Sequence, residues 1–234
     1  EVDDNVLWSA EANAKQVYYS AANNPGGAGG SIFVGSDGTG GVTMLKRMQN
    51  YLAVGTPKSI HIITGSSSSD FARLRVLQGV GVESHWSAVP VGDGLFWLDQ
   101  GGFRYGWITQ ERNDGMSYDT ISGNIKRRFD NIKDGTHNVV EGVYDEVNGQ
   151  ILWGVNPSGA SNRTEVLAFS MWHSTMKVQK PLEEPDLRYV WAGYWDGVTA
   201  NALSVVQEST GKNVVYFGGA DGYVQRYDPT LYKD

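Results

Sequence analysis

Apolar residues in this chain fall in short runs separated by polar turns, and the run–turn–run unit repeats to the end of the sequence. The last unit, Val214–Asp228, has an apolar run from Val214 to Phe217, a turn at 218–222 with three glycines, and a returning run from Tyr223 to Tyr227. Glycine takes the positive φ angles that tight turns need, and Asp-Gly pairs are common in hairpins. The first run is apolar on both faces, which predicts a strand lying between two layers.

The same pattern predicts several earlier elements. Predicted hairpins cover Ser31–Leu45, Asn50–Thr64, Gly94–Ile108 and Val139–Val155, and predicted single strands cover Val6–Trp8, Gln16–Ser20, Glu165–Met171, Tyr189–Tyr194 and Ala202–Gln207. Equivalent apolar positions recur after 44 residues, from Tyr51 to Leu95, and after 56 residues, from Leu95 to Ile151. A loose period of this order is typical of β-propeller blades.

We therefore predict an all-β fold, a β-propeller-like array of antiparallel hairpin blades with about four or five blades' worth of chain. Residues 1–234 are predicted to form a single domain that opens with short strands and a glycine-rich loop over 1–30. A two-sheet sandwich or an irregular barrel is the alternative architecture. The chain starts at Glu1 without a methionine, so we expect it to be processed or to be part of a longer chain.

Two segments interrupt the strand pattern. Asn23–Gly30 reads NNPGGAGG, has no helix or strand propensity, and is predicted to be a flexible loop. In Ile121–Ile132 the apolar residues recur with the spacing of one helix face, and Ser122 or Asp119 could cap the start of this helix. Because both segments interrupt the blade pattern without an evident core reason, we take as candidate interface residues Asn24, Pro25, Lys126, Arg127 and Arg128. A solvated helix face is the alternative interpretation of the basic triplet, and the one that charge runs favour.

Composition narrows the function classes. An apolar content of 40% over 234 residues is enough for a sizeable core. The net charge of −7 argues against general adhesion to nucleic acid or anionic membranes. No cysteine is present, which excludes disulfides and thiolate sites, and no apolar run is long enough to predict a membrane helix.

No pattern predicts a metal, a cofactor or a nucleophilic catalyst. The histidines stand alone in the sequence, at His61, His85, His137 and His173. There is no H-E-x-x-H motif, no G-x-S-x-G elbow and no P-loop, and a dinucleotide fingerprint is incomplete at Ser84. We therefore expect no cofactor and no catalytic residue.

Paired carboxylates give the alternative hypothesis. Some propellers hydrolyse glycosides with acidic residues, and this chain has acids near strand ends at Asp99, Asp145, Asp196 and Asp221, beside Trp97, Trp153 and Trp195. Asp196 and Asp221 precede glycine, where turn formation explains them. A carbohydrate-binding or glycoside-hydrolysing propeller is the second reading.

Three stretches, Val42–Gly65, Gly79–Gly106 and Ile121–Ile125, resemble the β-propeller proteins at the head-to-tail junction and tail hub, or nozzle, of short-tailed bacteriophages. The opening segment Leu7–Pro25 is similar to the start of that domain. The resemblance implies a structural virion protein rather than an enzyme, made in the cytoplasm of the bacterial host and located in the tail or neck.

The same resemblance implies partners. Proteins of this family form homo-oligomeric rings, commonly hexamers, that contact a portal or adaptor protein and other tail proteins and surround the DNA exit channel. They usually carry further domains, so this chain is expected to belong to a larger assembly. Its acidic balance is expected to keep DNA from sticking as it passes, without specific binding and without a membrane contact.

Overall fold

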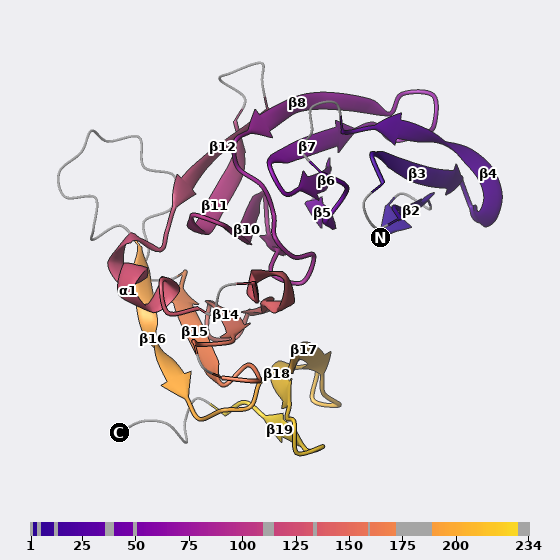
Figure 1. Cartoon of the computed structure of the whole chain (residues 1–234). Coiled ribbons are helices and arrows are strands. Elements are labelled where there is room, and N and C mark those ends of the chain that lie inside the picture. The colour runs from indigo at the N-terminus through magenta and orange to yellow at the C-terminus, as the bar shows by residue number, and fades with distance from the viewer. Residues whose placement is uncertain are drawn as a thin grey trace. The chain divides into compact units, whose positions relative to one another are not determined.

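The computed structural model describes residues 2–3, 6–11, 14–35, 40–48, 51–109, 115–132, 135–158, 160–171 and 189–228. It consists of five antiparallel sheets that follow one another along the chain (Figure 1). This confirms the predicted all-β, propeller-like array of hairpin blades. The chain divides into two compact units, Glu1–Thr120 and Ile121–Asp234, and the prediction of a single domain stays a prediction.

The first unit contains three four-stranded sheets, each with its strands in chain order. The strands are β1 (Val2–Asp3), β2 (Val6–Ser9), β3 (Gln16–Ala21), β4 (Asn24–Phe33), β5 (Met44–Met48), β6 (Tyr51–Thr56), β7 (Ser59–Thr64), β8 (Ala72–Gln78), β9 (Val89–Val91), β10 (Gly94–Asp99), β11 (Gly102–Thr109) and β12 (Gly115–Thr120). Sheets β1–β4, β5–β8 and β9–β12 each have the four-stranded meander of a propeller blade.

The second unit contains a four-stranded sheet, a three-stranded sheet and short helical turns. Its elements are η1 (Gly123–Ile125), α1 (Lys126–Phe129), η2 (His137–Val139), β13 (Glu141–Asp145), β14 (Gln150–Val155), β15 (Glu165–Ser170), β16 (Val190–Asp196), β17 (Ala202–Gln207), β18 (Asn213–Gly218) and β19 (Val224–Arg226). Four predicted hairpins are confirmed as β6–β7, β10–β11, β13–β14 and β18–β19.

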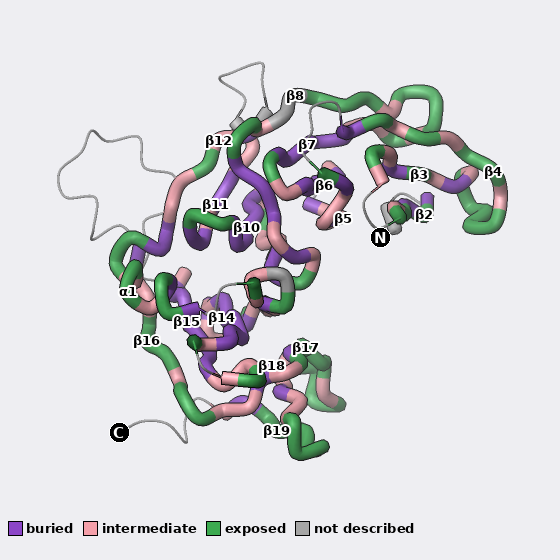
Figure 2. The backbone as a smooth tube through the Cα atoms, in the orientation of Figure 1, coloured by how far each residue is buried: buried purple, intermediate pink, exposed green. Residues whose placement is uncertain are grey.

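Strands in the middle of sheets β5–β8, β9–β12 and β13–β16 are largely buried on both faces, which explains their continuous apolar runs, whereas β2 in the first sheet alternates buried and exposed residues. Every residue of β10 is buried, and so is every residue of β15 (Figure 2). Trp97 on β10 and Trp153 on β14 are both 0% exposed. Packing inside the blades therefore accounts for both indoles.

The prediction of a flexible loop at Asn23–Gly30 is wrong, because residues from Asn24 onward form strand β4 at the edge of the first sheet. A Cβ at Gly29 would overlap the carbonyl of Tyr19 on β3, and one at Gly30 would overlap the Tyr19 ring. The pairing of β3 with β4 also shifts register beside Tyr19. Glycine is present because the two backbones approach closely, and Pro25 is accommodated on an edge strand.

The predicted hairpin at Ser31–Leu45 is also wrong. Its two halves belong to different sheets, because β4 pairs with β3 while β5 pairs with β6. After β4 the chain stays beside the start of β3, where the amides of Val34 and Gly35 donate to the carbonyl of Lys15. The segment is the passage from one blade to the next, and residues 36–39 of its predicted turn lie outside the described residues.

The predicted helix at Ile121–Ile132 is shorter than expected. Helical geometry covers η1 and α1, and Ser122 makes no side-chain cap. Asp119, the other predicted cap, lies within β12. The apolar spacing still identified the buried face, since Ile121, Phe129 and Ile132 are buried.

Sheet β13–β16 is covered on two faces within the second unit. Leu152, Val166 and Ala168 pack against Leu203, Val215 and Phe217 of sheet β17–β19. On the opposite side the Trp191 indole lies 5.7 Å from that of Trp153 and donates to the carbonyl of Ile121 at 2.8 Å. The helical segment thus fixes the outer face of this sheet.

The last hairpin deviates from its prediction in one respect. In β18 Val215 and Phe217 are buried, but Val214 and Tyr216 are only partly covered. The strand therefore packs against another sheet on one face only, and no described residues form a layer over its other face. Sheet β17–β19 has three strands, and β19 is exposed along its length.

Candidate functional site

Three of the four acids that the sequence suggested for sugar chemistry accept hydrogen bonds within their own hairpins. Asp99 ends β10 and is buried; its Oδ1 accepts the amide of Gly101 at 2.7 Å and its Oδ2 accepts Nε of Arg104 at 3.0 Å. A carboxylate that ties a turn amide to a neighbouring guanidinium is a structural element of the hairpin. Trp97 lies in the core rather than beside an open site.

Two of the three acids in the second unit, Asp145 and Asp221, have a similar role, and Asp196 does not. Asp145 is buried and accepts the backbone amide of Asn148 at 3.3 Å and its side-chain amide at 2.6 Å. Asp221 accepts the amide of Tyr223 at 3.1 Å within the last hairpin. Asp196 is the exposed last residue of β16, and its charge helps to raise the pKa of the Glu165 carboxyl.

A buried polar chain occupies the β6–β7 turn. Thr56 Oγ1 and Ser59 Oγ lie 2.7 Å apart, and Ser59 Oγ lies 3.0 Å from Nε2 of His61. All three side chains are nearly inaccessible to solvent. The Ser–His pair therefore holds the turn in place and has no access to a substrate.

His85 is the histidine with the most perturbed environment. Burial, and secondarily the charge of Lys46, lower the pKa of its imidazole to about 4. Its Nδ1 accepts the amide of Leu45 at 3.4 Å, so the neutral ring joins the segment before β9 to β5. Trp86 beside it is 61% exposed and differs in this from Trp97 and Trp153.

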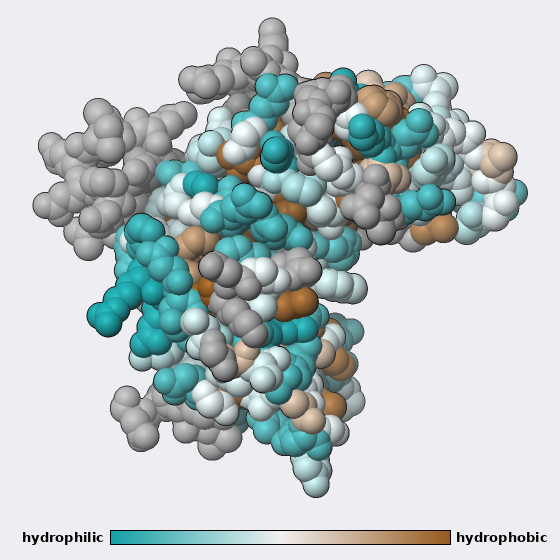
Figure 3. All heavy atoms as spheres, in the orientation of Figure 1, coloured by the Kyte–Doolittle hydropathy of each residue, from teal (hydrophilic) through white to brown (hydrophobic). Residues whose placement is uncertain are grey.

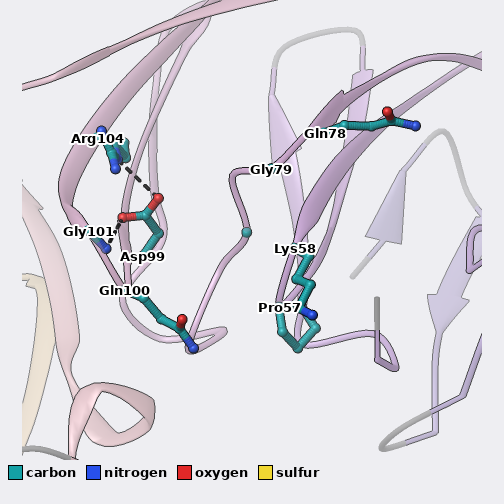
Figure 4. A pocket seen from close by; sticks show the side chains of 9 residues that line it. Pro57, Lys58, Gln78, Gly79, Asp99, Gln100, Gly101 and Arg104 are labelled. Atoms are coloured by element: carbon teal, nitrogen blue, oxygen red, sulfur yellow. Dashed lines mark hydrogen bonds and ion pairs between the residues drawn. The ribbon is translucent and has the colours of Figure 1, made fainter. Parts of the chain in front are cut away.

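A hollow in the first unit lies between the β6–β7 turn and the β10–β11 turn. It has a volume of 540 Å³, within the range of small-molecule sites. Its lining residues are Pro57, Lys58, Gln78, Gly79, Gly81, Asp99, Gln100, Gly101 and Arg104. Figure 4 shows Asp99, Gln100, Gly101 and Arg104 on one side and Pro57, Lys58 and Gln78 on the other, with Gly79 between them.

The segment between β8 and β9 forms the floor of this pocket and ties the two sheets together. The amide of Gly79 donates to the carbonyl of Lys58 at 3.0 Å, and the amide of Val82 donates to that of Thr56 at 2.8 Å. The next amide, of Glu83, donates to the carbonyl of Leu98 on β10 at 3.2 Å. A Cβ at Gly81 would overlap the backbone of Pro57, so this close passage requires glycine.

Apart from Asp99, sequence reasoning did not single out the polar residues of the pocket. Lys58, Gln78, Gln100 and Arg104 lie in no motif, and each is one polar residue in or beside a turn. Both hairpins, β6–β7 and β10–β11, were correctly predicted, but neither hairpin shows that the two turns face each other. The available signal was that a lysine and a glutamine occupy the turns of successive predicted blades.

The basic triplet of α1 is mostly engaged within the second unit, where the surface is hydrophilic (Figure 3). Lys126 pairs with Asp130 at 2.8 Å in an exposed i,i+4 contact. The Arg128 guanidinium lies 3.5 Å from the ring centroid of Tyr194 and 3.8 Å from the Glu165 carboxylate. Arg127 is exposed, and we find no hydrogen bond or ion pair of its side chain within the described ranges.

Asn24 and Pro25 are exposed on β4, so they are accessible, and their role as interface residues stays a prediction. No group of three or more histidine, aspartate or glutamate side chains gathers into a possible metal site among the described residues. His173 lies outside them. No helix in the described part of the chain is long and apolar enough to cross a membrane.

Comparisons with known proteins identify a fold and no family. No family model matches the chain, and no curated protein matches it. A solved structure of a protein from Lactobacillus plantarum is similar with a TM-score of 0.53, over 96% of this chain and 67% of that one. At 9% sequence identity this similarity concerns the propeller-like fold alone.

Proposed function

We propose that this chain is a structural β-propeller-like component of a short-tailed phage tail hub or neck ring, which docks to a portal or adaptor protein and surrounds passing DNA. The proposal rests on the sequence resemblance in Val42–Gly65, Gly79–Gly106 and Ile121–Ile125. One structural observation supports an architectural role: the buried acids Asp99 and Asp145 are used to fasten turns.

The geometry of these acids argues against the hydrolase alternative. A retaining or inverting glycosidase needs two carboxyl groups that flank a bound sugar and act as acid and base or nucleophile. Both oxygens of Asp99 and both oxygens of Asp145 accept hydrogen bonds from their own turns. Their substitution by asparagine is expected to change stability and to leave no glycosidase activity to lose.

An assembly measurement tests the proposal. Light scattering after size-exclusion chromatography gives the native mass, and negative-stain images of the same sample show whether a closed ring with a central channel forms, alone and with the candidate portal protein. A ring with an acidic or neutral channel is expected. A chain that stays monomeric with the portal protein, or a ring with a strongly basic channel, would contradict the proposal.

A further inference from the structure

The pocket between the β6–β7 and β10–β11 turns presents an excess of hydrogen-bond donors. Its carboxylate, Asp99, is already neutralised, because one oxygen accepts the Gly101 amide and the other accepts Arg104 Nε. Lys58 is exposed and forms no ion pair within the described residues. A ligand that approaches these groups therefore meets positive charge that its surroundings do not compensate.

Arg104 is preorganised to bind an oxygen ligand. Its Nε is held by Asp99, its Nη1 donates to Thr120 Oγ1, and its guanidinium lies 5.8 Å from the Tyr118 ring centroid. Only 16% of the side chain is exposed. The remaining nitrogen, Nη2, has no acceptor in the described part of the chain and lies beside Gly101, whose lack of a Cβ keeps the nitrogen uncovered.

Gln100 adds an amide to the lining, whereas the amide of Gln78 points away from the hollow in Figure 4. Gln78 at the end of β8 and Gln100 in the β10–β11 turn are both exposed, and neither side chain is hydrogen-bonded within the described residues. Figure 4 shows Gln100 and Lys58 on opposite sides of the hollow, with the bare backbone of Gly79 between them. An amide both donates and accepts, which suits hydroxyl groups, whereas lysine suits a carboxylate.

We propose that this pocket binds a sugar acid, a small hydroxylated carboxylate of the hexuronate class. Lys58 receives the carboxylate, and Arg104 Nη2 and the Gln100 amide on the opposite wall receive hydroxyl oxygens. The volume of 540 Å³ accommodates one such residue or the end of an acidic oligosaccharide. The site involves binding without bond cleavage, and it does not depend on the assembly role proposed above.

Saturation-transfer NMR titrations of the whole chain with matched ligands test the proposal. Glucuronate carries both recognition elements, glucose lacks the carboxylate, acetate lacks the hydroxyls, and inorganic phosphate is an anion without either. Glucuronate is expected to bind at least about tenfold more tightly than glucose, acetate or phosphate, since a hydrogen bond to a charged group is worth about one factor of ten or more.

Variants locate the binding. Lys58→Gln is expected to weaken glucuronate binding about tenfold and to leave glucose binding unchanged. Lys212→Gln removes the same charge from an exposed turn in the second unit and is expected to leave the affinity unchanged. Gly101→Ala places a methyl 2.6 Å from Arg104 Nη2, so the guanidinium must shift and glucuronate binding should fall.

The outcomes separate clearly. Equal binding of glucuronate and glucose, equal binding of glucuronate and phosphate, equal loss in Lys58→Gln and Lys212→Gln, or no binding of glucuronate would each overturn the proposal. Thermal melts show that each variant is folded. A failure of ring formation does not affect this result, and a failure to bind glucuronate leaves the ring proposal untouched.

Discussion

The two neighbouring sheets of the second unit are built from similar apolar sequences and reach different degrees of burial. In sheet β13–β16, strand β15 is buried at every position, and the Trp153 side chain of β14 is 0% exposed. In sheet β17–β19, Val206 is 45% exposed and Val224 is 71% exposed. The strand sequences alone do not account for this difference.

The difference comes from what lies on each side. Sheet β13–β16 has sheet β17–β19 on one face and the helical segment with Trp191 on the other. Sheet β17–β19 uses Leu203, Val215 and Phe217 for the shared core and carries a polar cluster on its other face, where Glu208 binds Tyr216 and Arg226. An apolar run thus permits burial on both faces, but neighbouring layers decide whether burial happens.

The largest expected effect that tests this contrast comes from Trp153→Ala. Removal of a fully buried indole leaves a cavity between β14 and the aromatic side chains of Trp191 and Phe169. We expect the free energy of unfolding to fall by about 3–5 kcal/mol, measured by denaturant titration. Trp153→Phe, which keeps a ring, should cost less, and equal costs would show that the indole is not tightly packed.

Gly154→Ala examines the contact between the two sheets. An added Cβ would lie 2.8 Å from Cδ1 of Leu203 and 3.0 Å from the carbonyl oxygen of Ala200. We expect a loss of about 1–3 kcal/mol because the sheets must move apart. Gly218→Ala, whose Cβ would have 3.3 Å to its nearest atom, is the milder control; the reverse order would contradict the packing described here.

Asp145→Ala removes the fastening of the β13–β14 turn. The two hydrogen bonds to Asn148 are lost, and we expect thermal unfolding to show a loss of about 1–2 kcal/mol. Asp221→Ala removes one exposed turn bond in the last hairpin and should cost less. A larger loss for Asp221→Ala would contradict the expectation that the turn in sheet β13–β16 contributes more to stability than the turn in sheet β17–β19.

We expect Glu165 and Glu208 to make the stability of the fold depend on pH in opposite directions. Burial raises the pKa of Glu165 above its ordinary 4.5, against the nearby Arg128 charge, so its contribution to stability is greatest below pH 4.5 and declines as the pH rises through the raised value. Hydrogen bonds from Arg226 and Tyr216 lower the pKa of Glu208, so its contribution is present above pH 4.5 and is lost as the pH falls through the lowered value.

Denaturant titrations between about pH 3 and about pH 7, a range that includes the ordinary glutamate pKa, measure both pH dependences of stability. Relative to the parent chain, Glu165→Gln should gain stability as the pH rises, and Glu208→Gln should gain stability as the pH falls. If both variants change the pH profile of stability in the same direction, the assignment of Glu165 to a buried environment and of Glu208 to an exposed one is wrong.

The smallest expected effect is that of Val206→Thr, which should change the free energy of unfolding by no more than about 0.5 kcal/mol because the side chain is half-exposed. Val166→Thr places the same hydroxyl in the shared core and should cost clearly more. Equal costs would mean that a further layer covers the last sheet in solution.

Part of this architecture could be predicted from the sequence. Hairpins β6–β7 and β10–β11 were predicted because apolar runs flank short turns, at Thr56–Lys58 and at Gln100–Gly102. The first part of strand β4, from Asn24 to Gly30, was missed because its glycines serve a close approach to Tyr19, which only the folded sheet reveals. Outer strands β8 and β12 were missed because their largely exposed or mixed sequences lack a continuous apolar run.

The candidate site was harder to predict than the fold. Asp99 was identified as an acid at a strand end, but its use by Gly101 and Arg104 depends on side-chain geometry. Lys58 and Gln100 come from turns far apart in the sequence, and their convergence depends on the path of the segment between β8 and β9. Local periodicity carries no information of that kind.

The path of the segment between β8 and β9 also affects local unfolding of the first unit. The amides of Gly79 and Val82 bond to the β6–β7 hairpin and the amide of Glu83 bonds to β10, so neither sheet can detach without breaking the connection between them. Sheets β5–β8 and β9–β12 should therefore exchange their amide hydrogens as one cooperative folding unit, with a common opening free energy. The amide of Val82 should be among the slowest of these to exchange with solvent, although it lies outside every strand.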